Sequence, residues 1–141
     1  MADANVLIAA YLRNSTIRRV ILLSDIQLVV PEFIFEELER HLPELSKRAG
    51  LSKARSEELL ERLRSRFVAI PEELVSSKLQ TALDAMRDID AKDAPYLAAA
   101  LSVASEGIWS DDPHMKKQDL VPCYTTAELL DRLRKEGFSL R

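Results

Sequence analysis

The sequence contains few of the residues that define disulfide-stabilised and membrane-spanning proteins. Its 141 residues include one cysteine, Cys123, so an internal disulfide is excluded and no second thiol is available for a zinc cluster. No apolar run approaches the roughly 20 residues that cross a bilayer, and we expect no secretory leader. We therefore expect a cytoplasmic protein without membrane association.

Positive charge and side-chain amides are also scarce. The formal net charge of -3 argues against a protein that holds nucleic acid through a bulk excess of positive charge. Local basic groups remain, and Arg13, Lys116 and Lys117 are candidates for contacts with RNA phosphates, with a solvated helix face as the alternative for each. The chain has two asparagines and three glutamines but 30% charged residues, a usage typical of a thermophilic source.

The pattern of apolar residues predicts an α/β fold in a single domain over residues 1–141. Short strands alternate with longer helices, which indicates right-handed βαβ units and a mostly parallel sheet. Three signals set boundaries: Pro31 begins a helix, Gly107 ends one in the left-handed conformation, and Thr125 with Glu128 forms a capping box. The expected strands are residues 27–30, 67–70, 108–110 and 121–124, and the expected helices are residues 5–12, 16–23, 32–41, 52–66, 74–87, 94–105 and 127–135.

Four acidic residues lie far apart in the chain but fall where such a fold brings side chains to one edge of its sheet. Asp3 precedes the first helix, and Glu37 lies in the second turn of the helix after the first of these strands. Asp93 begins a helix, and Asp112 follows the third of these strands. Ligands of α/β proteins bind at the carboxyl ends of the strands. Carboxylates that converge there repel one another until a hard cation such as Mg²⁺ or Mn²⁺ binds, so the sequence predicts a metal site suited to phosphate chemistry.

Each of these acids also has an ordinary structural explanation. Asp3 and Asp93 suit helix N-caps, which are worth about 1 kcal/mol each and need no metal. Glu37 suits an exposed helix position, and Asp112 suits a turn ahead of Pro113. These explanations do not account for the shared location of the four acids, so we favour the metal site.

Four short segments resemble the motifs of PIN-domain nucleases and occur in the same order. They are DANVLI at residues 3–8, PEFIFEEL at 31–38, KDAPYLAAA at 92–100 and IWSDD at 108–112. Each motif alone is weak, but four in register across nearly the whole chain are a specific signal. The resemblance implies a three-layer α/β/α sandwich with a short, mostly parallel central sheet.

The resemblance also implies roles for individual residues. The positions that match the family's catalytic and metal-site acids are Asp3, Glu37, Asp93 and Asp112. Asn5 and Ser110 match polar residues that support the site. The implied activity is cleavage of RNA with Mg²⁺ or Mn²⁺, in which a metal-activated water attacks phosphorus. Many such nucleases are VapC-like toxins, so the expected protein partners are a small antitoxin and a second copy of the chain in a homodimer.

The chain departs from the family pattern at two points. Only Met1 and Ala2 precede Asp3, so we expect a truncated first strand and weaker backbone support for that acid. His114 stands two residues after Asp112, where many relatives carry another acid. For His114 we favour a surface turn over a metal ligand.

Adjacent acids leave two assignments open. Glu36 competes with Glu37, and Asp111 competes with Asp112. We choose the second of each pair, because the leucine and the serine of the two motifs then keep their spacing from the acid. Asp90 is a further candidate in the loop before the third motif.

Two other functions compete with a metal-dependent ribonuclease. Phosphoaspartate chemistry, as in a phosphatase, also uses an aspartate at a strand end. A haloacid-dehalogenase-like nucleophile, however, carries a second aspartate two residues later, where Asn5 stands here. The other alternative is a catalytically inert PIN-like module that dimerises or docks a partner through its first two helices, which are apolar on most sides.

Overall fold

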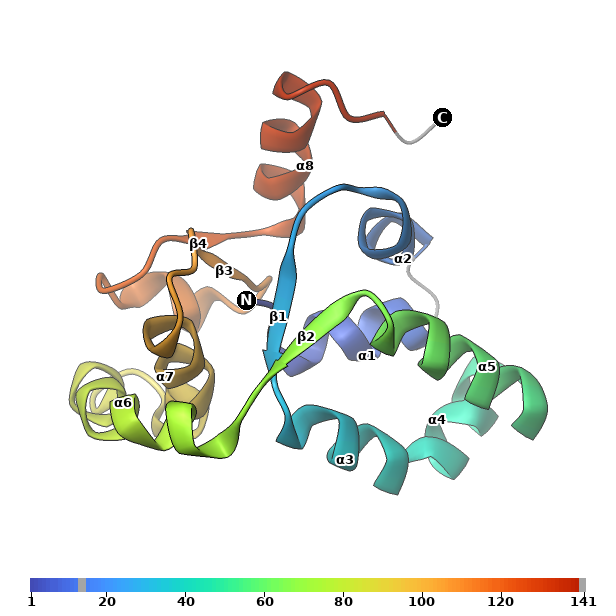
Figure 1. Ribbon diagram of the computed structural model, residues 1–141, viewed down its shortest axis with the longest axis horizontal. Coiled ribbons are helices and arrows are strands. Elements are labelled where there is room, and N and C mark those ends of the chain that lie inside the picture. Colours follow the sequence, from blue (N-terminus) through green and yellow to red (C-terminus); the bar gives the residue numbers. More distant parts are fainter. Residues whose placement is uncertain (13–14, 140–141) are drawn as a thin grey trace.

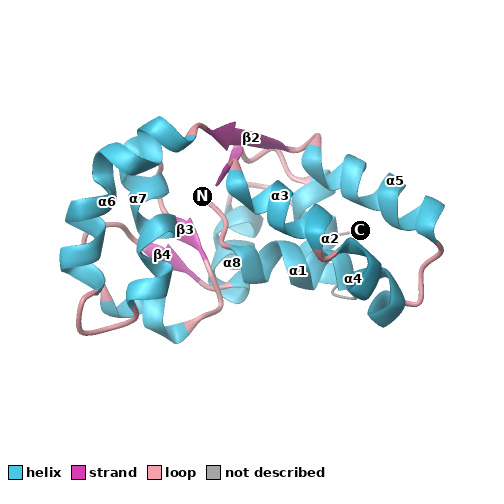
Figure 2. Cartoon of the chain, turned by 90° about the horizontal axis from the view of Figure 1, so that it is seen from below, coloured by secondary structure: helices cyan, strands magenta, loops and turns pink. Residues whose placement is uncertain are grey.

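The computed structural model describes residues 1–12 and 15–139, and its helices enclose short parallel strands (Figure 1). The α-helices are α1 Ala4–Leu12, α2 Ser15–Leu23, α3 Phe33–Arg40, α4 Leu42–Ala49, α5 Lys53–Arg64, α6 Glu72–Met86, α7 Ala94–Ser102 and α8 Thr126–Lys135, the 3₁₀ helices are η1 Ala91–Asp93 and η2 Pro113–Lys117, and the strands are β1 Leu28–Pro31, β2 Phe67–Ile70, β3 Ile108–Trp109 and β4 Cys123–Tyr124. Helices α6 and α7 lie on one side of the strands and α1 to α5 on the other (Figures 1 and 2). This arrangement confirms the expected α/β sandwich. None of the helices in the described ranges is long and apolar enough to cross a membrane.

The segment around Ala2 joins two parallel pairs of strands. β1 pairs with β2, with Leu28 opposite Phe67, and β3 pairs with β4. Ala2 donates its N–H to the carbonyl of Val29 at 3.1 Å and forms a parallel bridge with Trp109. The order across the molecule is therefore β2, β1, the Ala2 segment, β3 and β4. The segment at Ala2 thus lies between β1 and β3, at the centre of the strand order, and contributes an isolated bridge with Trp109 where the sequence predicts a short first strand.

The apolar residues of α1 and α2 lie in the protein's own core. The two helices pack against each other, and α1 also packs against α4. The buried residues of these helices are Val6, Leu7, Ala10, Tyr11, Ile17, Val20 and Ile21. The chain itself therefore buries the apolar surface of α1 and α2. The apolar character of these two helices is explained by the protein's own core, without a docked partner.

Pro31 ends a strand, and the prediction that it begins a helix is wrong. It pairs with Ile70 at the end of β1, and α3 starts at Phe33. The ladder does not need an N–H from the proline, because the N–H of Glu32 donates to the carbonyl of Ile70 at 3.0 Å. Helix α4 is not among the predicted helices, and its first turn contains Pro43.

Gly107 does not adopt the left-handed conformation that the sequence analysis predicts. Among the described residues only Gly50 and Gly137 have a positive φ, and α7 ends earlier, at Ser102. Gly107 is needed for a different reason, because a Cβ atom there would lie 2.5 Å from the Cε2 atom of Tyr124. The capping box of Thr125 and Glu128 at the start of α8 is confirmed.

The guanidinium of Arg66 holds the end of α2 and the approach to β1 against the start of β2. Its Nε donates to the carbonyl of Ile21 at 2.8 Å, and one terminal nitrogen donates to the carbonyls of Ser24 and Ile26 at 2.8 and 3.3 Å. One side chain thus satisfies three backbone acceptors in the segment that leads into β1.

Replacing Arg66 by alanine is expected to lower the free energy of unfolding by about 2 kcal/mol, because three carbonyls lose a charged donor. Urea denaturation followed by circular dichroism measures the change. Arg62→Ala is the matched control, since Arg62 is exposed on α5 and its loss should cost less than about 0.5 kcal/mol. Equal effects of the two substitutions would contradict the role given to Arg66.

Candidate metal centre

The chain brings three of the four predicted acids together at one edge of its strands. Asp3 follows the bridge at Ala2, Asp112 follows β3, and Asp93 stands at the start of α7. Their carboxylates influence one another's ionisation. Burial first, and then the negative charge of Asp112, raises the pKa of Asp3.

Ser110 links the carboxylate of Asp3 to the backbone of Asp112. Its hydroxyl is fully buried and donates to Oδ2 of Asp3, and it accepts a hydrogen bond from the N–H of Asp112 at 3.1 Å. The other oxygen of Asp3 accepts from the N–H of Val6 at 3.1 Å, which is the N-cap contact expected for this residue. Both oxygens of Asp3 are therefore fixed in direction.

Asp93 carries a carboxylate oxygen without a hydrogen-bond donor. Its Oδ2 atom is buried and has no partner among the described residues. The side chain does not cap α7, so the N-cap explanation is wrong for Asp93; Asp90 instead caps η1 by accepting from the N–H of Lys92. Burial, followed by the negative charges of Asp90, Asp112 and Asp3, raises the pKa of Asp93 to about 6. The site therefore favours a proton or a cation at this carboxylate.

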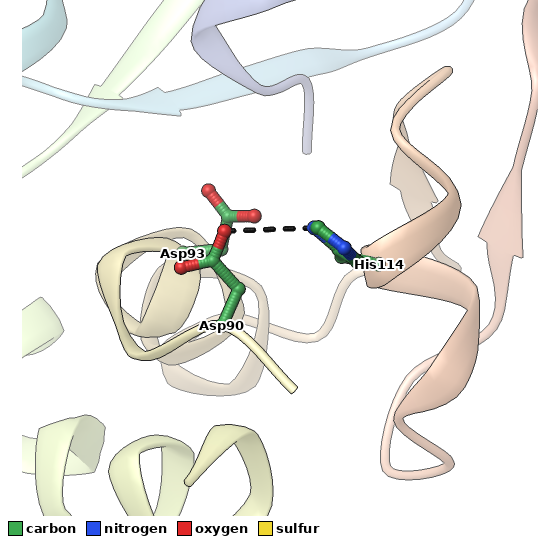
Figure 3. Close-up of side chains that lie close together, drawn as sticks. All are labelled: Asp90, Asp93 and His114. Atoms are coloured by element: carbon green, nitrogen blue, oxygen red, sulfur yellow. Dashed lines mark ion pairs between the residues drawn. The ribbon is translucent and has the colours of Figure 1, made fainter. Parts of the chain in front are cut away.

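Asp90 and His114 extend the cluster beside Asp93 (Figure 3). Nδ1 of His114 lies 3.6 Å from Oδ2 of Asp90 and 3.5 Å from Oδ1 of Asp112. One ligand atom each from Asp90, Asp93 and His114 lies within 4.8 Å of the other two. His114 belongs to the 3₁₀ turn η2, so it occupies a turn, as the sequence suggests, and its imidazole faces the acids.

Glu37 lies on α3, and its charge acts on Tyr96, as do the charges of Asp3 and Asp93. Burial first, and then the negative charges of Glu37, Asp3 and Asp93, raises the pKa of the Tyr96 hydroxyl. Glu37 also lines a cavity of about 180 Å³ between α1, α3 and α4. Glu36 and Glu37 are both exposed, and of the two only Glu37 lines this cavity. This cavity is not lined by Asp3, Asp93 or Asp112, so the choice of Glu37 over Glu36 stays a prediction.

Asp111 makes structural hydrogen bonds at the start of α8. Its two oxygens accept from the N–H and the hydroxyl of Thr126 at 2.7 and 2.6 Å. Asp112 instead turns toward the cluster, where its Oδ1 accepts from the N–H of His114 at 2.9 Å. The choice of Asp112 over Asp111 is thus supported by their hydrogen bonds.

The remaining candidates lie outside the cluster of carboxylates. Asn5 is exposed in the first turn of α1. Lys116 forms an ion pair with Glu128 and donates to a backbone carbonyl, whereas Lys117 is exposed in the same turn. Arg13 lies outside the described residues. Of the two candidate lysines, Lys116 would have to lose its ion pair with Glu128 before contacting a phosphate, and Lys117 has no ion pair with the described residues.

Two residues near the acids are not singled out as site residues by the sequence motifs. Tyr96 follows Asp93 by three residues, which puts both on one face of α7, so a signal for Tyr96 was available in the spacing. His114 also has a signal, because it stands two residues after Asp112 where many relatives carry another acid, but its contact with Asp90 depends on how η2 packs beside η1.

The structure is an α/β sandwich with clustered carboxylates at the edge of short parallel strands. The model of the PIN domain family matches residues 1–134, and the chain belongs to this family. Members of the family are generally nucleases, and these nucleases generally use divalent metal ions. Neither the curated proteins nor the solved structures include a match to the chain.

The residues present fit a divalent cation. The donors are carboxylate oxygens, which hard cations prefer, and the buried Oδ2 of Asp93 has no other partner among the described residues. The negative charges of Asp112 and Asp3 act on Asp93. Asp90 and His114 each place a ligand atom within 4.8 Å of a ligand atom of Asp93. An ion there would offset both the burial and the mutual repulsion of the acids.

Removing the charge of Asp93 is expected to stabilise the protein in the absence of metal ions. Because its pKa is raised from 3.8 to about 6 in the folded state, Asp93 favours folding while protonated, and this contribution is lost as the pH rises through about 6. In a chelating buffer at pH 7.5, Asp93→Asn should therefore raise the free energy of unfolding by about 1 kcal/mol, after allowance for screening by solvent. The gain should disappear below pH 4.

Thermal unfolding at several pH values provides the measurement. Asp84→Asn is the control, because Asp84 is exposed and pairs with Arg87 on the surface. This control should show no stabilisation at either pH. A lower melting temperature of Asp93→Asn at pH 7.5 would contradict the electrostatic account.

Proposed function

We propose that the protein is a metal-dependent ribonuclease, in which Asp3, Glu37, Asp93 and Asp112 hold Mg²⁺ or Mn²⁺. The observation that carries the proposal is the buried Oδ2 of Asp93, which lies near other carboxylates and has no donor within residues 1–12 and 15–139. A site that leaves a carboxylate in this state has a higher free energy than one in which a cation is bound. Because the chain belongs to a family of nucleases, we assign cleavage of phosphodiester bonds to this cation site.

The chain's own residues orient the acids before a substrate binds. The Ser110 hydroxyl and the Val6 N–H fix both oxygens of Asp3, so this carboxylate does not have to rotate when a ligand arrives. Tyr96 keeps its proton, because burial and then the surrounding acids raise its pKa, and its hydroxyl can donate to a phosphate oxygen. A divalent cation held by the acids would supply an activated water for attack on phosphorus and would neutralise charge on the leaving oxygen.

Phosphate groups on either side of the cleaved bond need positive charge, since the acids repel them. Lys117 is exposed in η2, the turn that also carries His114, and we assign it to this contact. Arg13 and Lys116 are weaker candidates. Such contacts position the RNA without reading its sequence.

The partners in the proposal follow from the family. PIN nucleases act on RNA or DNA and often pair with antitoxins. We infer that this chain acts on RNA in the cytoplasm, as a homodimer, and that a small antitoxin controls it. Light scattering tests the homodimer, and co-expression with the product of a neighbouring gene tests the antitoxin.

Asp93→Asn and Asp112→Asn are each expected to reduce RNA cleavage by at least about 100-fold, because loss of a residue that only supports a metal ligand already costs 10- to 100-fold. The assay follows a fluorescent single-stranded RNA with Mn²⁺, with Mg²⁺ and with a chelator. Asp131→Asn, an exposed position on α8, should retain full activity. Cleavage by the chelated protein, or unchanged cleavage by either variant, would overturn the proposal.

Glu37→Gln and Glu36→Gln form a matched pair on adjacent positions of α3. Glu37→Gln should reduce cleavage strongly, because Glu37 is the residue whose charge acts on Tyr96 beside Asp3 and Asp93. Glu36→Gln should leave the rate unchanged. If instead Glu36→Gln lost activity, the second acid of the site would have to be reassigned.

A further inference from the structure

We propose that Asp90, Asp93 and His114 form a mixed carboxylate and imidazole subsite that makes this centre bind Mn²⁺ in preference to Mg²⁺. The inference rests on the proposed function, because Asp93 belongs both to the four-acid site and to this subsite. It adds Asp90 and His114 to the four acids and names the class of ion that they select.

The three side chains converge from two separate segments of the chain. Asp90 caps η1 and Asp93 is its last residue, and both carboxylates turn toward the imidazole of His114, which comes from η2 (Figure 3). Their ligand atoms lie within 4.8 Å of one another. Ligand atoms that share one ion at about 2.2 Å lie at most about 4.4 Å apart. A small rotation of one side chain therefore completes a common coordination sphere.

The backbone holds the two added ligands in place. Oδ1 of Asp90 accepts from the N–H of Lys92 at 3.1 Å, which leaves its Oδ2 on the side of the imidazole. The N–H of His114 donates to Asp112 at 2.9 Å, and the next residue, Met115, is buried and anchors the turn. Ligands fixed in this way lose little conformational freedom when an ion binds.

The nitrogen ligand determines which ion is preferred. Mg²⁺ favours oxygen ligands in a near-ideal octahedron and retains several waters. Mn²⁺ shares the preference of Mg²⁺ for carboxylate oxygen, but as a transition-metal ion it accepts one imidazole nitrogen in its coordination sphere at a lower cost than Mg²⁺ does. If His114 only formed an ion pair with Asp90 and Asp112, it would not discriminate between the two ions.

Pulsed electron paramagnetic resonance of the Mn²⁺-loaded protein tests direct coordination by His114. The wild-type spectrum should contain a coupling to imidazole nitrogen, which His114→Ala should remove. The chain has two histidines, and His41→Ala is the matched control that should retain the coupling. By calorimetry, His114→Ala should weaken Mn²⁺ binding by at least about tenfold and leave Mg²⁺ binding nearly unchanged, whereas Asp90→Asn should weaken both.

The outcomes separate this inference from the proposed function. Bound Mn²⁺ that supports RNA cleavage without a nitrogen coupling, or equal loss of both ions in His114→Ala, would overturn the subsite and leave the four-acid nuclease standing. No binding of either ion to the wild-type protein and no cleavage would overturn both.

Discussion

The carboxylates of Asp3, Asp93 and Asp112 stand close together where access to water is reduced, and their repulsion is the interaction on which the rest of the site depends. Burial and neighbouring charge raise the pKa of both Asp3 and Asp93. The surrounding structure resists a relaxation that would separate these charges, because Ser110 and the Val6 N–H hold Asp3 in position. The folded chain therefore keeps an electrostatic cost that bound positive charge can offset, and this links its stability to its proposed function.

Close packing in the scaffold is what brings the acids together. Helix α7 is buried on more than one side, since the successive residues Ala98, Ala99 and Ala100 are each at most 2% exposed. Their small side chains allow α7 to pack closely against α6 and β1, which it contacts. The start of α7, and with it Asp93, is thereby held near the end of β3. Larger residues at these positions would move the helix outward and weaken the convergence of the carboxylates.

Much of the fold could be predicted from the sequence, because its signals are local. The apolar period of α6 and the capping box at Thr125 depend on residues that are close in the chain. The features that were missed depend on contacts between distant segments. Gly107 looked like a helix terminator, yet its lack of a side chain serves the approach of the Tyr124 ring. The position of Asp93 at a helix start suggested a cap, and only the tertiary structure reveals that its Oδ2 atom accepts no hydrogen bond from the residues that the structure describes. For the same reason no local pattern identified His114 as a neighbour of Asp90.

The adjacent pair Asp111 and Asp112 illustrates how one of two chemically identical residues comes to serve structure. Successive residues of an extended segment point in opposite directions, so the two carboxylates cannot both enter the cluster. Asp111 binds the start of α8 through Thr126, whose hydroxyl also accepts from the indole of Trp109 in β3. These bonds fix the chain at the end of β3 immediately before Asp112. Ser110 fixes it from the other side by accepting the N–H of Asp112. The orientation of Asp112 toward the cluster is thus set by the two residues before it.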